Sequence, residues 1–108
     1  MNDDTRFDQD GFIRDPAAWD EALADALAAQ AGIAPLAAAH WKVIGALRRH
    51  YFETGGVPVM RHICRDAGLD EHCVSDLLAD PRRAWRIAGL PNPGEEAKAY
   101  IETSETHD

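Results

Sequence analysis

The chain lacks any apolar run close to the roughly 18 residues that a membrane-spanning helix requires. Residues 1–4 are acidic, whereas a secretory signal begins with basic residues. Only two cysteines occur, Cys64 and Cys73, and they do not make a disulfide framework in an intracellular setting. No Cys-x-x-Cys or His-x-x-x-His spacing supports zinc. These absences predict a cytoplasmic protein with no membrane partner, no metal and no cofactor.

What is present is ordinary for a single globular domain. With 108 residues, 45% hydrophobic and 28% charged, the chain can bury a core without disulfides or a metal. The net charge of −8 is unevenly spread, because acids dominate residues 1–39 and 87–108 and bases slightly outnumber acids in residues 40–86. This distribution weakens attraction to nucleic acid and allows a local basic patch for an acidic protein surface.

Turn and cap signals divide the chain into short elements. Residues 7–13 predict a small hairpin, because Asp10-Gly11 tolerates a tight turn between apolar residues. Asp15-Pro16 is a cap-and-proline helix start, and that helix is expected to end at Gly32. The further helices are expected at residues 35–53, 58–68, 70–79 and 80–89.

The predicted fold is mainly all-α: a compact five-helix bundle with a small N-terminal hairpin and an extended C-terminal arm. Residues 1–93 form the helical domain, and residues 94–108 form an acidic arm or tail. The two helices within residues 58–79 also fit a helix-turn-helix unit.

The stretch from Ala84 to Glu96 resembles the C-terminal arm of the DsrC/TusE family of sulfur-relay proteins, small helical proteins that carry sulfur on an arm cysteine. The family pattern reads roughly Ala-Cys-Lys-Ile-Ala-Gly-Leu-Pro-Lys-Pro-Thr-Gly-Cys. Four further segments are similar to family motifs in the same order: Asp10-Gly11-Phe12-Ile13 followed by Trp19, His40-Trp41-Lys42-Val43-Ile44, Leu47 to Phe52, and Pro58 to Arg61.

The two arm cysteines of the family are replaced in this chain. Trp85 occupies the place of the first and Glu96 that of the second, and no cysteine follows residue 73. Neither side chain can hold a persulfide. The chain also continues some twelve residues past the point where the family pattern ends. The resemblance therefore implies the scaffold and sulfur metabolism, while no residue on the arm is expected to be catalytic.

Cys64 and Cys73 are the alternative thiols. Basic neighbours that could lower a thiol pKa are Arg61, His62, Arg65 and His72. The favoured interpretation is that both are small core residues, where free cysteines are most often found.

The strongest interaction candidates are three arginines that surround an aromatic residue: Arg82, Arg83 and Arg86 with Trp85. Guanidinium groups bind carboxylates, and Trp85 could serve as an aromatic anchor or fill the core, with the core slightly favoured. Arg48 and Arg49 extend the candidate patch.

Three functional hypotheses follow. The first is a regulatory or adaptor variant that docks on a sulfite-reductase-like or sulfurtransferase-like protein partner without relaying sulfur. The second is a relay protein for tRNA thiolation or sulfur oxidation that uses Cys64 or Cys73. The third is a DNA-binding regulator acting through the helix-turn-helix unit, which is disfavoured because residues 70–79 hold three acids and neither Lys nor Arg.

Overall fold

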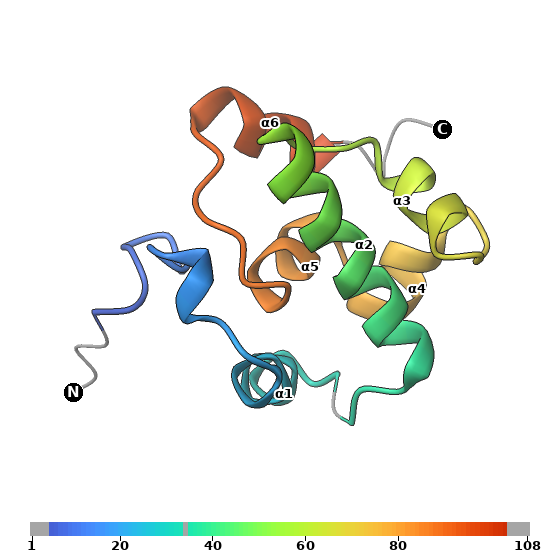
Figure 1. Ribbon diagram of the computed structural model, residues 1–108, viewed down its shortest axis with the longest axis horizontal. Helices are drawn as coiled ribbons and strands as arrows, with labels where there is room; N and C mark the ends of the chain where they lie inside the picture. Colours follow the sequence, from blue (N-terminus) through green and yellow to red (C-terminus); the bar gives the residue numbers. More distant parts are fainter. Residues whose placement is uncertain (1–4, 34, 104–108) are drawn as a thin grey trace.

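The computed structural model describes residues 5–33 and 35–103 (Figure 1). The described chain is mainly helical, as predicted, and a sixth α-helix joins the five expected ones. The α-helices are α1 (Glu21–Gln30), α2 (Ala38–Thr54), α3 (Met60–Asp66), α4 (Cys73–Leu78), α5 (Pro81–Ile87) and α6 (Glu95–Thr103). None of the helices in the described ranges is both long and apolar enough to cross a membrane.

Two helices organise the packing. The long helix α2 contacts α3, α4 and α5, and α5 also contacts α1, α4 and α6 (Figure 1). The largest fully buried side chains come from the N-terminal turn, from α2 to α5 and from the segment after α5, and include Phe12, Ile44, Leu47, Met60, Ile63, Leu78, Trp85, Ile87 and Leu90. The short helix α5 is therefore the element that the rest of the molecule fixes most directly.

The N-terminal segment forms a turn closed by one antiparallel bridge, and the predicted hairpin is not confirmed as a pair of strands. One isolated bridge joins Phe7 and Ile13, and no strand is present in the described part of the chain. The carboxylate of Asp8 accepts hydrogen bonds from the backbone N–H groups of Asp10 (2.9 Å) and Phe12 (3.0 Å). Gly11 has φ +88°, as the tight turn requires. Backbone hydrogen bonds from Asp8 N–H to the Phe12 carbonyl (2.8 Å) and from Arg14 N–H to the Arg6 carbonyl (2.7 Å) accompany the bridge, so the pairing extends over this single rung.

The first predicted helix is interrupted. Asp15 caps only a single 3₁₀ turn, Pro16–Ala18, and the chain is extended at Trp19. Asp20 then caps α1 by accepting a hydrogen bond from the backbone N–H of Leu23 at 2.8 Å. The break lets the indole of Trp19 turn toward the C-terminal part of the molecule.

The connection from α4 to α5 is very short. The backbone N–H of Asp80 donates to the carbonyl of Leu78 at 2.8 Å, and the intervening Ala79 has φ +72°. This is the geometry of a strained three-residue turn. Asp80 and Pro81 then begin α5 as the sequence predicted, with the Asp80 carboxylate accepting from the backbone N–H of Arg83 at 2.8 Å.

Candidate functional site

The root of the arm, residues 87–91, is held by side chains from two other parts of the chain. The indole of Trp19 donates to the carbonyl of Ile87 at 2.8 Å. The guanidinium of Arg48 donates to the carbonyls of Ala88 (2.9 Å) and Gly89 (3.1 Å). Because these carbonyls end α5, the hydrogen bonds satisfy groups that a helix terminus leaves without partners.

Arg48 is fixed by further contacts and is thus part of the packing at the arm root. It donates to the carbonyl of Pro16 at 3.2 Å, and its guanidinium carbon lies 4.1 Å from the ring centroid of Trp19. Burial lowers the pKa of Arg48. A partner would have to displace these contacts to reach the guanidinium, so we leave Arg48 out of the docking surface.

Gly89 is required by the closeness of Trp19. Its φ is +71°, and a Cβ placed there would overlap the Trp19 side chain. The Gly-Leu-Pro sequence that marks the family arm therefore has a local cause in this structure, which is the approach of a tryptophan from the N-terminal segment.

The two positions that correspond to arm cysteines lie in different environments. Trp85 is 1% exposed, packs edge-on against Tyr51 at a centroid distance of 6.0 Å, and donates to the carbonyl of Pro91 at 2.8 Å. Glu96 is exposed on α6. Trp85 is thus a core residue in this structure and not the exposed aromatic anchor of a docking surface.

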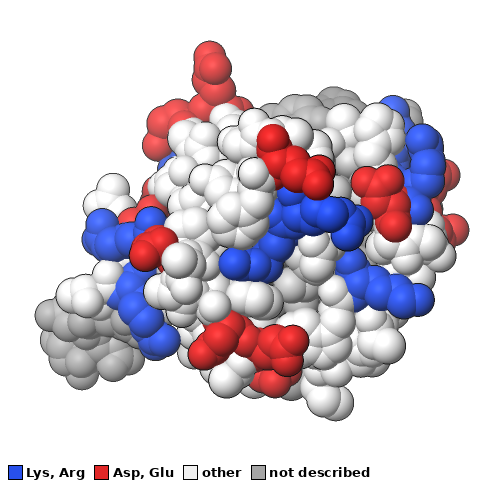
Figure 2. All heavy atoms as spheres, in the orientation of Figure 1, with Lys and Arg blue, Asp and Glu red and all other residues white. Residues whose placement is uncertain are grey.

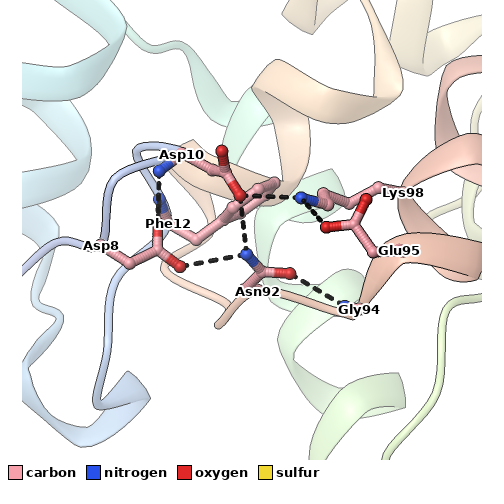
Figure 3. Close-up of polar contacts among 7 residues, drawn as sticks. All are labelled: Asp8, Asp10, Phe12, Asn92, Gly94, Glu95 and Lys98. Atoms are coloured by element: carbon pink, nitrogen blue, oxygen red, sulfur yellow. Dashed lines mark hydrogen bonds and ion pairs between the residues drawn. The ribbon is translucent and has the colours of Figure 1, made fainter.

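Beyond the root, the arm is fastened to the N-terminal turn by polar groups (Figure 3). We call this set the arm clasp: Asp8, Asp10, Asn92, Glu95 and Lys98. The Asn92 amide donates to the carboxylates of Asp8 and Asp10, both at 3.1 Å. The Lys98 ammonium contacts Asp10 at 2.7 Å and Glu95 at 3.0 Å. The clasp joins the start of the chain to α6, which also packs on α5.

The clasp changes the acidity of its charged groups. The hydrogen bond from Lys98 is the largest cause that lowers the pKa of Asp10, and the same bond raises the pKa of Lys98. Burial acts to raise the pKa of Asp8, but hydrogen bonds from the Phe12 backbone and from Asn92 outweigh it, so the pKa is lowered overall. The clasp is therefore in its charged form at neutral pH.

The clasp residues were not among the predicted site residues. Lys98 is the only Lys or Arg after Arg86, in an otherwise acidic segment. This isolated positive charge is the sequence feature that could have indicated an ion pair there. Its two partners could not be chosen from the sequence, because Asp10 lies 88 residues away and many other carboxylates were available.

Cys64 and Cys73 form a disulfide, which corrects the expectation of two separate free thiols. The bridge links α3 to the first residue of α4 across a sequence separation of nine. Both residues are buried, with 0% and 3% exposure, so their placement in the core agrees with the favoured interpretation. The prediction failed because it judged each cysteine by its own helix, whereas the turn between the helices brings the two Cα atoms to 5.7 Å.

The remaining arginine candidates divide between two elements. Arg49 is exposed on α2, whereas Arg82, Arg83 and Arg86 lie on α5. Arg83 pairs with Asp80 at 3.3 Å on the surface. Arg82 and Arg86 both lie over the ring of Phe12, at 5.8 and 5.4 Å from its centroid. The structure thus gathers three of the predicted arginines beside the N-terminal turn.

Arg86 has an unusual environment. Its Nε atom is buried and has no hydrogen-bond partner among the described residues. Burial is the largest cause that lowers the pKa of Arg86, followed by the nearby charge of Arg82. Arg83 and Arg86 line a cavity of about 310 Å³ together with Gly11, Leu27, Gln30, Ala31 and Ile87. This cavity opens between α1, the N-terminal turn and α5.

The helix-turn-helix unit predicted at residues 58–79 corresponds to α3 and α4. Helix α4 has six residues, of which Asp76 is charged and none is Lys or Arg. On the face shown in Figure 2, basic and acidic side chains are interspersed and form no broad basic surface. DNA binding through this unit stays an untested prediction. No group of three or more potential metal ligands is found in the parts of the chain that the structure describes.

Comparisons with known proteins agree on one family. A family model described as "DsrC like protein" matches residues 1–95. Proteins named "Sulfurtransferase TusE" from Salmonella typhimurium and Pectobacterium atrosepticum are 33% and 35% identical over 95 residues, covering 80% of this chain and 86% of each relative. The oxidized gamma-subunit of the dissimilatory sulfite reductase (DsrC) from Archaeoglobus fulgidus is 32% identical with a TM-score of 0.69, covering 84% of this chain and 90% of that chain. The family-model match ends at the first residue of α6.

Proposed function

Because this chain belongs to the DsrC/TusE family, a family of sulfur-relay proteins, we propose that it is a non-relaying regulatory or adaptor member. It docks on a sulfite-reductase-like or sulfurtransferase-like partner, or competes with a sulfur carrier for that partner. The observation that carries the proposal is the loss of both arm thiols, with Trp85 in the core and Glu96 on α6.

The state of the arm supports this proposal. A carrier must present its thiolate on an accessible segment that moves between partner sites. Here the arm root is tied to Trp19 and Arg48, and the arm clasp holds α6 to the N-terminal turn. An arm held in this way suits a fixed docking surface better than a sulfur shuttle.

The partner class rests on the relatives. One solved relative is titled as a subunit of the dissimilatory sulfite reductase, and the curated relatives are named as sulfurtransferases. Both names favour a protein complex of sulfur metabolism as the partner. We propose a cytoplasmic site of action together with this role.

The absence of relay is tested by sulfur loading. The protein is incubated with a low-molecular-weight persulfide donor, once oxidised and once after reduction of the Cys64–Cys73 bridge, and its intact mass is measured. We expect no added sulfur on the oxidised protein, since both sulfurs are buried and bonded to each other. Sulfur that attaches to either cysteine and then moves to an acceptor protein would establish the relay hypothesis instead.

The matched control is Glu96→Cys, which restores a thiol at an exposed position of the arm. This variant is expected to take up one sulfur atom under the same conditions, which shows that the donor is active. Trp85→Cys is unsuitable as a control, because removing a buried tryptophan leaves a cavity and costs about 3–5 kcal/mol of folding stability.

Docking is tested separately by pull-down with immobilised sulfite reductase and with immobilised sulfurtransferase complexes from the same organism. We expect retention on at least one of them and competition with a carrier that has arm cysteines. Failure to bind any of these complexes would overturn the adaptor proposal. A gel shift with DNA at low salt addresses the third hypothesis, and a salt-sensitive shift would favour it.

A further inference from the structure

The surface between α1 and α5 is lined by positively charged side chains, whereas the whole chain is acidic. The cavity beside Arg83 and Arg86 adjoins a second cavity of about 390 Å³, and the two share Gly11, Leu27 and Gln30. We call the two together the α1–α5 cleft. The second cavity is also lined by Arg6, Phe7, Leu23 and Ala26. No Asp or Glu lines either cavity, although the whole chain carries a net charge of −8.

The cleft combines cationic walls with an apolar floor. Leu27 and Ile87 contribute aliphatic surface beside the guanidinium groups of Arg83 and Arg86. Arg86 approaches the backbone closely, since its Nε lies 3.5 Å from the position that a Cβ on Gly11 would occupy. A Cβ at residue 11 would be in ordinary van der Waals contact with this guanidinium.

Arg86 lacks an acceptor. A buried N–H donor without a hydrogen bond is energetically unfavourable. The guanidinium of Arg86 has no ion pair or hydrogen bond among the described residues, and its neighbour Arg83 pairs with Asp80 at 3.3 Å on the exposed side of α5. A carboxylate entering the cleft can bind the terminal nitrogens of both guanidinium groups, because guanidinium and carboxylate groups match in a two-pronged geometry.

From this arrangement we infer that the α1–α5 cleft binds an acidic segment of the partner protein, with a Glu or Asp side chain on Arg86 and Arg83 and an adjacent apolar side chain on Leu27. The inference rests on the proposed docking function and identifies the chemistry of its partner. An extended peptide fits two adjoining open cavities, since a side chain can enter each one while the backbone crosses between them. Charge complementarity selects an acidic occupant, as no carboxylate of the cleft would repel it.

The test uses isotope-labelled full-length protein and a synthetic peptide of alternating glutamate and leucine, observed by NMR at low and at physiological salt. We expect the Nε–H signal of Arg86 and the backbone signals of residues 23–31 and 83–87 to shift on titration. A matched peptide of alternating glutamine and leucine should leave these signals unchanged. Shifts spread evenly over the surface, or an equal response to inorganic phosphate, would overturn the assignment.

Variants locate the binding energy. Arg86→Gln is expected to lower the affinity for the acidic peptide at least tenfold, and Arg83→Gln is expected to lower it by about threefold to tenfold. Because the Arg83 side chain is half exposed, its substitution should not disturb folding. Arg65→Gln removes the same charge from an exposed site on α3 and should leave the affinity within about twofold. Equal loss in Arg65→Gln would show that the peptide responds only to net charge and would overturn the inference.

A third variant tests whether the peptide occupies the α1–α5 cleft, and it does so without removing an arginine. Gln30→Glu places a carboxylate at the rim of the cleft, where it should pair with the arginines and weaken the peptide. The same variants are then examined in the pull-down with the sulfur-metabolism complexes. If the complexes bind all variants as tightly as the unchanged protein, docking stands and the cleft is not its site. If no complex binds the unchanged protein, the docking proposal itself fails.

Discussion

At the scale of single residues, small and large side chains fix the arm root together. The Trp19 side chain lies so close to the backbone of Gly89 that there is no room for a Cβ at residue 89. Trp85 and Trp19 use their indole N–H groups on carbonyls at the two ends of the same segment, Pro91 and Ile87. Trp85, which stands where the family pattern has a cysteine, thus helps to hold the arm in place.

Gly89→Ala should therefore destabilise the fold for two reasons. The positive φ costs a non-glycine residue about 1–2 kcal/mol, and overlap with Trp19 adds a further ~1–3 kcal/mol. Urea unfolding is the measurement, and we expect a clearly lower midpoint. The matched control is Gly55→Ala, which has a similar φ of +76° with no atom near the added Cβ, so it should show the backbone cost alone. Equal losses in the two variants would contradict the role of Trp19.

At the scale of elements, caps decide where helices begin, but packing decides which of them continue. Asp15-Pro16 predicted a helix start and Asp15 does cap, yet the helix ends after one turn because Trp19 is drawn toward Ile87. Asp80-Pro81 predicted α5 correctly, since the Asp80 carboxylate caps the helix and Pro81 occupies its first position. The predicted hairpin is reduced to one antiparallel bridge between Phe7 and Ile13, and the Asp8 carboxylate accepts from backbone N–H groups within the turn.

The disulfide is the covalent link between two of these elements, α3 and α4. Closing a loop of this length lowers the entropy of the unfolded chain and stabilises the fold by about 2–3 kcal/mol. We expect a reducing agent to lower the urea midpoint accordingly. In the Cys64→Ala/Cys73→Ala double variant, the midpoint should not respond to the reductant. An unchanged midpoint in the unmodified protein would mean that the bridge does not form, which is the usual condition of cytoplasmic thiols.

At the scale of the whole molecule, the arm clasp connects the two ends of the described chain. Asp10 and Lys98 lie 88 residues apart, and their contact places α6 against the body of the bundle (Figure 3). In Figure 1, α6 lies at one side of the bundle and α1 at the opposite side. The clasp thus adds a polar attachment to the arm, which is also held at its root by Trp19 and Arg48.

The clasp should respond to pH at both extremes. The pKa of Asp10 is lowered, so its contribution is complete above the usual value of 3.8 and is lost as the pH falls through the lowered value. The pKa of Lys98 is raised, so its contribution is complete below the usual value of 10.5 and is lost as the pH rises through the raised value. NMR titration of the Asp10 carboxyl carbon measures the first transition.

The variant that isolates this effect is Lys98→Met, which keeps the length of the side chain and removes its charge. The pKa of Asp10 should then return toward its usual value, and the amide protons of α6 should exchange faster at neutral pH. Glu95→Gln is the milder comparison, since Asp10 keeps its ion pair with Lys98. An unaltered Asp10 pKa in Lys98→Met would show that the clasp does not persist in solution.

The sequence by itself determined the helical class, the caps at Asp15 and Asp80, the family frame from Ile87 to Pro91, and the loss of thiols from the arm. These features depend on local propensity, on order along the chain, or on which atoms a side chain contains. Only the tertiary structure decided that Cys64 meets Cys73, that Lys98 meets Asp10, and that Arg86 faces a cleft. Each of these contacts depends on which elements pack together. That packing follows from the burial of the whole core, and local sequence patterns do not specify it.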